Sequence, residues 1–207
     1  MENQSCRDSE ANPFEDILLE MFEVAINTIL YVRNIYPRGI FERYQKYNMA
    51  VMMSKHPDVN LYISNVLCSM KPLIHKNELE KLVIQINNEK GFPLDKFCFD
   101  LKLKQFENKV CYLELELYLR SFLLKLMTCN VLLKPHSKEC TFQVLIYTNM
   151  SSWQHLIEDE DQAFPWVVEN EALHKKSVIT PIRSCDTQLF SLQCYVEEYE
   201  QNKETLT

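Results

Sequence analysis

The stretch from Val110 to Cys129 carries leucine or phenylalanine at almost every turn and contains neither glycine nor proline. Wound at about 100° per residue, it gathers a few polar side chains into one narrow stripe and leaves most of the remaining surface apolar. The stripe consists of Glu114, Ser121, Lys125 and Thr128. A helix that is apolar on nearly all sides belongs inside a domain. The pattern therefore predicts that this helix is the centre of the fold.

Two charged residues interrupt the apolar side of that helix. Glu116 and Arg120 lie four positions apart, in the acidic-before-basic order that favours pairing along a helix. One interpretation is an ion pair within the helix at the edge of the core. The other is a docking surface, because an arginine combines an apolar stem with a planar charged head.

Two more helices are predicted nearer the N-terminus. Asn12 is a candidate N-cap and Pro13 suits the first helical position, and apolar residues keep a three-four spacing from there to Ile35. The second helix starts at Pro57, and Pro72 is expected to bend or end it.

Strands are predicted at 47–53, at 82–86 and 97–101 around a turn containing Gly91, at 141–148 and at 189–196. In the last of these, Gln193 and Tyr195 lie on the face opposite the apolar residues. The order of elements predicts an α+β fold, with a layer of helices against a mostly antiparallel sheet. The character of the chain changes at Asn149, after which acidic and proline-containing segments alternate with short strands.

Charge and length exclude several classes of protein. The 207 residues suffice for one large domain, and the net charge of −7 argues against direct binding of nucleic acid, which needs clustered lysine and arginine. No signal peptide opens the sequence and no run of about eighteen apolar residues occurs, so neither secretion nor a membrane span is expected. The eight cysteines are scattered without a C-x-x-C pair, which suits the reducing cytosol or nucleus.

Motifs of catalysis and of cofactor binding are missing. With only two glycines, far apart, neither a phosphate-binding loop nor a dinucleotide fingerprint exists. Cys129, His136 and Cys140 are the best metal candidates but match no standard zinc spacing. The acidic run 158–161 is expected to be a solvated loop. The sequence thus predicts a protein with no enzymatic activity, no cofactor and no metal, and a thiol-dependent enzyme using one of the cysteines is kept as the alternative.

Large amphipathic side chains are the remaining candidates for function. Tyr62, Trp166 beside Pro165, and Tyr195 are of the kind that dominate interface energetics. Packing in the core is the competing interpretation for each, and the pattern leaves both open.

Many short motifs, in one order along the chain, resemble the HORMA-domain family, and within it the accessory subunits of translesion DNA polymerase zeta. They are Ile29-Leu30-Tyr31-Val32-Arg33, Tyr36-Pro37, Gly39-Ile40-Phe41, Lys46-Tyr47-Asn48, His56-Pro57, Asn60, Tyr62-Ile63, Lys71-Pro72-Leu73, Cys140-Thr141-Phe142, Phe164-Pro165-Trp166 and Tyr195-Val196-Glu197-Glu198. The match runs from about residue 14 to 200.

The resemblance implies a domain over 12–200, in which three helices pack on the sheet. It consists of a core at 12–148 and a mobile "safety belt" at 149–200, between a disordered N-terminus (1–11) and a flexible C-terminus (201–207). The closed belt wraps an extended peptide against the sheet edge, a form of strand addition.

The resemblance also implies three sites. Tyr62 and Trp166 match positions that grip a peptide of the catalytic subunit of polymerase zeta. Ile179, Gln193 and Tyr195 match positions that contact the C-terminal domain of a Y-family polymerase, the deoxycytidyl transferase.

The third implied site mediates pairing with a second HORMA domain, in a homodimer or a heterodimer. It consists of Arg43, Arg120 and Val131, and it favours the docking interpretation of Arg120. The implied protein is a non-catalytic adaptor in translesion synthesis, in the nucleus and also the cytoplasm, with end-protection or cell-cycle proteins as further partners. A spindle-checkpoint or meiotic HORMA protein that traps a cell-cycle or chromosome-axis peptide is the alternative.

Overall fold

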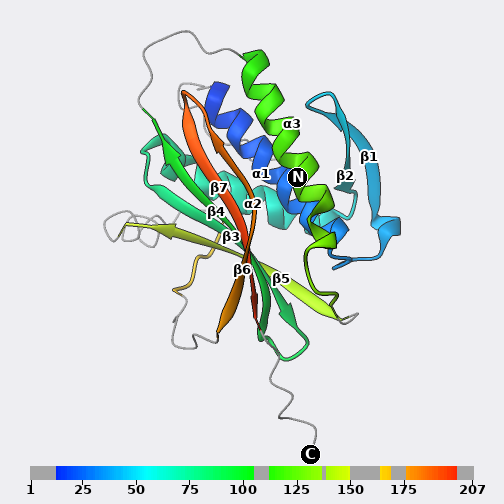
Figure 1. Cartoon of the computed structure of the whole chain (residues 1–207). Coiled ribbons are helices and arrows are strands. Elements are labelled where there is room, and N and C mark those ends of the chain that lie inside the picture. Colours follow the sequence, from blue (N-terminus) through cyan, green and yellow to red (C-terminus); the bar gives the residue numbers. More distant parts are fainter. Residues whose placement is uncertain (1–12, 105–111, 137–138, 150–163, 169–175, 200–207) are drawn as a thin grey trace, which may run out of the picture.

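The computed structural model describes residues 13–104, 112–136, 139–149, 164–168 and 176–199. Within these ranges, three helices cover one face of a twisted sheet (Figure 1). They are α1 (Pro13–Val32), α2 (Pro57–His75) and α3 (Tyr112–Thr128). Two single turns of 3-10 helix, η1 (Arg38–Ile40) and η2 (Cys129–Val131), follow α1 and α3.

Five strands form the main sheet, in the spatial order β5-β3-β4-β7-β6. They are β3 (Leu79–Asn88), β4 (Pro93–Leu103), β5 (Cys140–Thr148), β6 (Ser177–Asp186) and β7 (Phe190–Tyr199). All four pairings between neighbouring strands are antiparallel. The predicted α+β layer of helices on an antiparallel sheet is confirmed, and β5 and β6 are the two edges of the sheet.

The centre of the fold is α1, so the prediction that the 110–129 helix occupies it was wrong. From Val24 to Leu30 every residue of α1 is buried, including the polar Asn27 and Thr28. The Thr28 hydroxyl donates to the Val24 carbonyl at 2.7 Å, while Asn27 Oδ1 accepts the backbone N–H of Ser54. Buried polar groups are tolerated where they are hydrogen-bonded, and these bonds let α1 run through the core.

Helix α3 lies at the side of the domain and is amphipathic. Its buried residues face the core, whereas Leu113, Leu117 and Leu124 are exposed by 69%, 58% and 47%. Ser121, in the predicted polar stripe, accepts a hydrogen bond from Arg183 of β6 at 3.2 Å. Leucine-rich composition therefore does not mean burial on every side here, and the exposed leucines leave an apolar strip on the surface.

A hairpin of β1 (Phe41–Lys46) and β2 (Met49–Ser54) replaces the single strand predicted at 47–53. Tyr47 and Asn48 form its turn with φ of 49° and 52°, as two-residue hairpin turns require. β1 escaped prediction because all but its first and last residues are exposed, so no apolar alternation marks it. The hairpin is separate from the main sheet.

The helix boundaries need small corrections, whereas β3 and β4 extend several residues beyond the predicted 82–86 and 97–101, and β6 was not predicted. Helix α1 ends at Val32 because Asn34 takes a left-handed φ of 53°, and Ile35, expected inside the helix, lies beyond its end. Pro72 does not end α2, which continues to His75. The β3–β4 turn contains Gly91 at φ +79°, as its sequence predicts.

Several predictions concern residues outside the described ranges: the termini 1–11 and 201–207 and the acidic run 158–161. In the described part of the chain, no helix combines the length and the apolar character that crossing a membrane demands.

Candidate functional site

An aromatic cluster joins α2, the edge strand β5 and the segment 164–168. Tyr62 of α2 meets Phe142 of β5 edge-to-face at a centroid distance of 5.4 Å, and meets Phe164 at 5.5 Å. Phe164 in turn packs against Trp166, with ring centroids 4.6 Å apart and the rings tilted by 59°. Phe142 also contacts Tyr36, which lies between α1 and η1. Tyr62 and Trp166, predicted to share a site, are thus linked through one phenylalanine.

The Tyr62 phenol touches the open edge of the sheet. Its oxygen accepts the backbone N–H of Val144 at 3.2 Å, and β5 has no strand on its outer side in the described sheet. Burial raises the pKa of Tyr62, so the phenol stays protonated at neutral pH. Edge strands offer unpaired N–H and C=O groups to an incoming strand. Tyr62 therefore stands where an added strand would meet the protein.

Trp166 is held on α2 by its own hydrogen bond. Its indole N–H donates to the Ser69 hydroxyl at 3.2 Å, and Ser69 donates to the Val66 carbonyl at 2.7 Å. The indole is half-buried, while Pro165 and Val167 beside it are exposed. Aromatic faces of this kind bind proline rings and aliphatic side chains.

The three residues predicted to bind a Y-family polymerase share the outer face of the sheet, away from the helices. Tyr195 pairs with Pro181 and Gln193 with Ser184, and Ile179 lies across from Glu197 on the same side. Ile179 is 61% exposed, Gln193 is exposed and Tyr195 is half-buried.

The residues predicted for HORMA pairing lie on three elements and are all exposed. Arg43 is on β1, Arg120 on α3 and Val131 on η2, where its side chain is 89% exposed. Within the described ranges, no ion pair joins Arg120 to Glu116, so the first interpretation of that spacing has no support. The exposed leucines of α3 leave apolar surface on the helix that carries Arg120.

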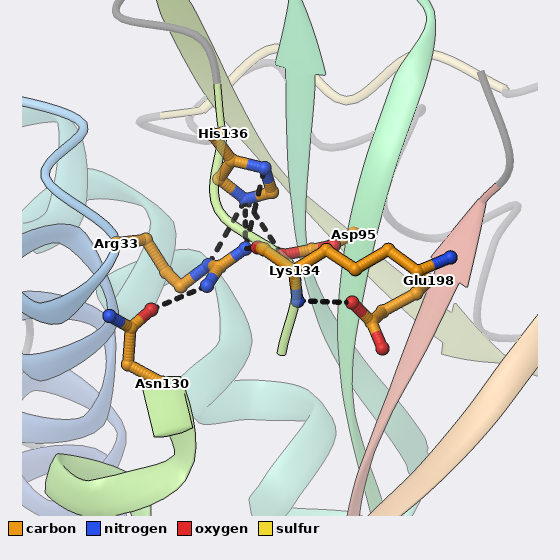
Figure 2. A network of polar contacts seen from close by, with 6 residues as sticks. All are labelled: Arg33, Asp95, Asn130, Lys134, His136 and Glu198. Carbon is orange, nitrogen blue, oxygen red and sulfur yellow. Dashed lines mark hydrogen bonds and ion pairs between the residues drawn. The ribbon is translucent and has the colours of Figure 1, made fainter. Parts of the chain in front are cut away.

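A polar network with buried charges at its centre, which the sequence did not reveal, links several elements of the domain (Figure 2). Its six members come from the residue after α1, from β4 and β7, and from the segment that follows α3: Arg33, Asp95, Asn130, Lys134, His136 and Glu198. Asp95 Oδ2 lies 2.8 Å from Arg33 Nη2 and 2.7 Å from His136 Nε2. The side chains of Arg33 and Asp95 are 1% and 3% exposed. A charge buried this deeply persists only when it is paired and hydrogen-bonded.

The network also reaches the last strand. Arg33 donates to the Lys134 carbonyl at 2.7 Å, and the Lys134 backbone N–H donates to Glu198 of β7 at 2.8 Å. β7 lies within 149–200, so Glu198 connects the predicted belt to the core. Residues 33, 95, 136 and 198 are far apart in the sequence, so no local sequence pattern could predict that they form one network. Among the metal candidates, His136 is engaged by Arg33 and Asp95, and Cys129 is buried.

The buried thiols are poor nucleophiles. Burial raises the pKa of Cys98 to about 12 and that of Cys129 to about 11. Since the thiolate is the reactive form, we expect both to be labelled by a thiol reagent at pH 8 at least about a hundredfold more slowly in the native protein than in urea. Peptide mapping by mass spectrometry would measure each site. A native rate equal to that in urea would contradict the structure and favour the thiol-enzyme alternative.

Comparison with known proteins gives the family. The model described as "HORMA domain" matches residues 16–116. A zebrafish protein named "Mitotic spindle assembly checkpoint protein MAD2B" is 38% identical over 192 residues, which cover 90% of this chain and 91% of that protein. The chain belongs to the HORMA-domain family.

Other HORMA relatives carry two kinds of name. The human protein, also named "Mitotic spindle assembly checkpoint protein MAD2B", is 36% identical over 190 residues, covering 88% of this chain and 90% of its own. An Arabidopsis thaliana protein named "DNA polymerase zeta processivity subunit" is 28% identical over 192 residues, covering 92% and 88%. The resemblance predicted from the motifs is thereby confirmed at the level of the family and of its polymerase zeta relatives.

Solved structures confirm the HORMA fold. A chain in "Crystal Structure of Mitotic Checkpoint Complex" matches with a TM-score of 0.76 at 23% identity, covering 91% of this chain and all of that one. The structure of C. elegans HTP-2 bound to a HIM-3 closure motif matches with a TM-score of 0.68 at 10% identity, covering 89% of each. At these identities the likeness concerns the fold alone.

Proposed function

We propose that this HORMA protein is a non-catalytic adaptor subunit of DNA polymerase zeta in translesion synthesis, acting in the nucleus. It holds a peptide of the catalytic subunit under residues 149–200 and binds the C-terminal domain of a Y-family polymerase on the outer face of the sheet. The observation that carries the proposal is the aromatic cluster at the open edge of β5, where Trp166, from the segment 149–200, meets Tyr62 of the core. The name of the plant relative supplies the polymerase.

The peptide is expected to lie along β5 as an added strand, since that edge offers backbone groups for pairing. Tyr62 and Trp166 then supply aromatic surface for its proline and aliphatic side chains. A peptide enclosed by the chain leaves only after the enclosing segment opens, so slow release follows without a large interface. Nothing in this scheme requires chemistry by the protein itself.

The outer face is opposite the helices and separate from the aromatic cluster, so one molecule can hold both partners. We expect Tyr195→Ala to weaken binding of the Y-family domain by roughly 2 kcal/mol, the cost typical of an aromatic interface residue, and to leave affinity for the catalytic-subunit peptide unchanged. Calorimetry with each purified partner measures both. Equal loss of the two would indicate misfolding instead of a local site.

The experiment that tests the bridging role is a pull-down from nuclear extract with wild type, Trp166→Ala and Tyr195→Ala, read by mass spectrometry. We expect the first variant to lose a B-family polymerase and the second to lose a Y-family polymerase.

The relatives named for the spindle checkpoint favour a second candidate function, trapping of a cell-cycle or chromosome-axis peptide. If the wild-type pull-down recovers mitotic or meiotic regulators and no polymerase, this second function is the correct one.

We also propose that Arg43, Arg120 and Val131 form a surface for a second HORMA domain. Their exposure, together with the apolar strip on α3, supports this. End-protection and cell-cycle proteins remain proposed partners of the same adaptor.

A further inference from the structure

The outer face of the sheet carries Lys81 on β3, and Lys96 and Lys102 on β4. The register of the strands aligns Tyr147 of β5, Lys81 of β3, Asp100 of β4 and Gln193 of β7 in one row across the sheet. Tyr195 lies on the same face, in the next row, where it pairs with Cys98. Lys81 thus stands two strands away from β7, whose outer residues are proposed to bind the Y-family polymerase.

Lys81 spans that distance and holds Tyr195. Its Nζ donates to the Tyr195 phenol oxygen at 3.0 Å and pairs with Asp100 Oδ1 at 3.2 Å. The same ammonium lies 5.3 Å from the centre of the Tyr147 ring, within the range of cation–π attraction. One side chain therefore contacts the hydroxyl of Tyr195 and lies beside the ring of Tyr147.

The ammonium of Lys81 is stabilised in its charged form. Partial burial acts to lower its pKa, but the hydrogen bonds to Tyr195 and Asp100 outweigh burial and raise it. An ammonium can only donate, so the Tyr195 oxygen acts as the acceptor in this contact. The Lys81 side chain is 29% exposed, so it lies close enough to the surface to act on a bound partner.

We propose that Lys81 is a positioning residue of the partner site on the outer face: it fixes the Tyr195 ring in the orientation that the partner binds. The proposal rests on the assignment of Tyr195 to the Y-family polymerase site. A side chain held before binding loses less conformational freedom on binding, which strengthens the complex. The ammonium beside Tyr195, which is paired with Asp100, can also donate to an acceptor group of the partner.

A double-mutant cycle tests the coupling. The full chain is titrated into the purified C-terminal domain of the Y-family polymerase as wild type, Lys81→Met, Tyr195→Phe and the double variant. Methionine keeps much of the length of the lysine stem and removes the charge. We expect each single variant to weaken binding by about five- to tenfold, and the double variant to be no weaker than the poorer single one. Lys81→Arg, which keeps the cation, should recover most of the affinity.

Two further measurements separate the possible failures. Affinity for the catalytic-subunit peptide serves as the control and should be unchanged in Lys81→Met. The Tyr195 ring is followed by NMR in tyrosine-labelled protein without any partner, where Lys81→Met should shift its resonances and increase its mobility. An unchanged Tyr195 signal, or additive effects in the cycle, would overturn the positioning role. Wild type that fails to bind the domain would instead contradict the proposed function, while the NMR result still decides the role of Lys81.

Discussion

Replacing Arg33 with methionine is expected to lower the free energy of unfolding by about 3–5 kcal/mol, the usual effect of breaking a buried ion pair. Without the guanidinium, the 3% exposed carboxyl of Asp95 has only His136 beside it, and the Lys134 carbonyl loses its donor. A buried carboxylate without a counter-charge pays the full cost of leaving water. Urea unfolding followed by circular dichroism measures the change.

Two comparisons make this test specific. Lys55→Met removes a pair with Glu42 in which both side chains are about half exposed, and it should change stability by less than about 0.5 kcal/mol. Adding Asp95→Met to Arg33→Met should recover part of the loss, because apolar side chains replace a buried pair with little penalty. A loss below about 1 kcal/mol for Arg33→Met would show that the network contributes little.

Trp166→Ala should weaken binding of the catalytic-subunit peptide by roughly 2–4 kcal/mol, as removal of an aromatic anchor does. The substitution deletes the ring that packs against Phe164 and the N–H that donates to Ser69. Tyr62→Ala is expected to have an effect of the same size. Isothermal titration calorimetry with the purified peptide measures both, and a change under about 0.5 kcal/mol would rule out the assigned site.

A matched pair of variants controls for general damage. Tyr44→Ala removes a 48% exposed tyrosine from β1, outside the aromatic cluster, and should leave peptide affinity unchanged. Tyr62→Phe keeps the ring but removes the oxygen that accepts the Val144 N–H. Its loss should be smaller than that of Tyr62→Ala, and the difference measures the ring alone.

Apolar periodicity predicted where the helices lie, but it could not rank them by burial. The 110–129 helix looked central because leucines cover it, yet Leu113 and Leu117 face solvent. Helix α1 carries Asn27 and Thr28 within its buried half, satisfied by bonds to Ser54 and to its own backbone. Hydrogen bonds that form only in the folded protein thus allow α1 to be more buried than α3, although the composition of the two helices suggests the opposite.

The binding residues were predicted through motif resemblance, and alternation supported one of them. The pattern of 189–196 placed Tyr195 away from the core, which the burial of β7 matches. No local pattern could bring Tyr62 to Trp166, or Lys81 to Tyr195, because these contacts join strands and helices far apart in the chain. The same holds for the partners of Arg33, a lone charge at the end of an apolar helix.

The place of β4 in the sheet bears on how the nascent chain matures. Phe97 pairs with Ile84, 13 positions earlier, and with Val196, 99 positions later. Long-range pairings of this kind slow folding, and a strand with one unpaired edge is a template for aggregation. During synthesis, the second edge of β4 therefore stays unpaired until the ribosome has added the 99 residues from Phe97 to Val196. Until then that edge is open to pairing with other chains, which exposes the nascent protein to aggregation.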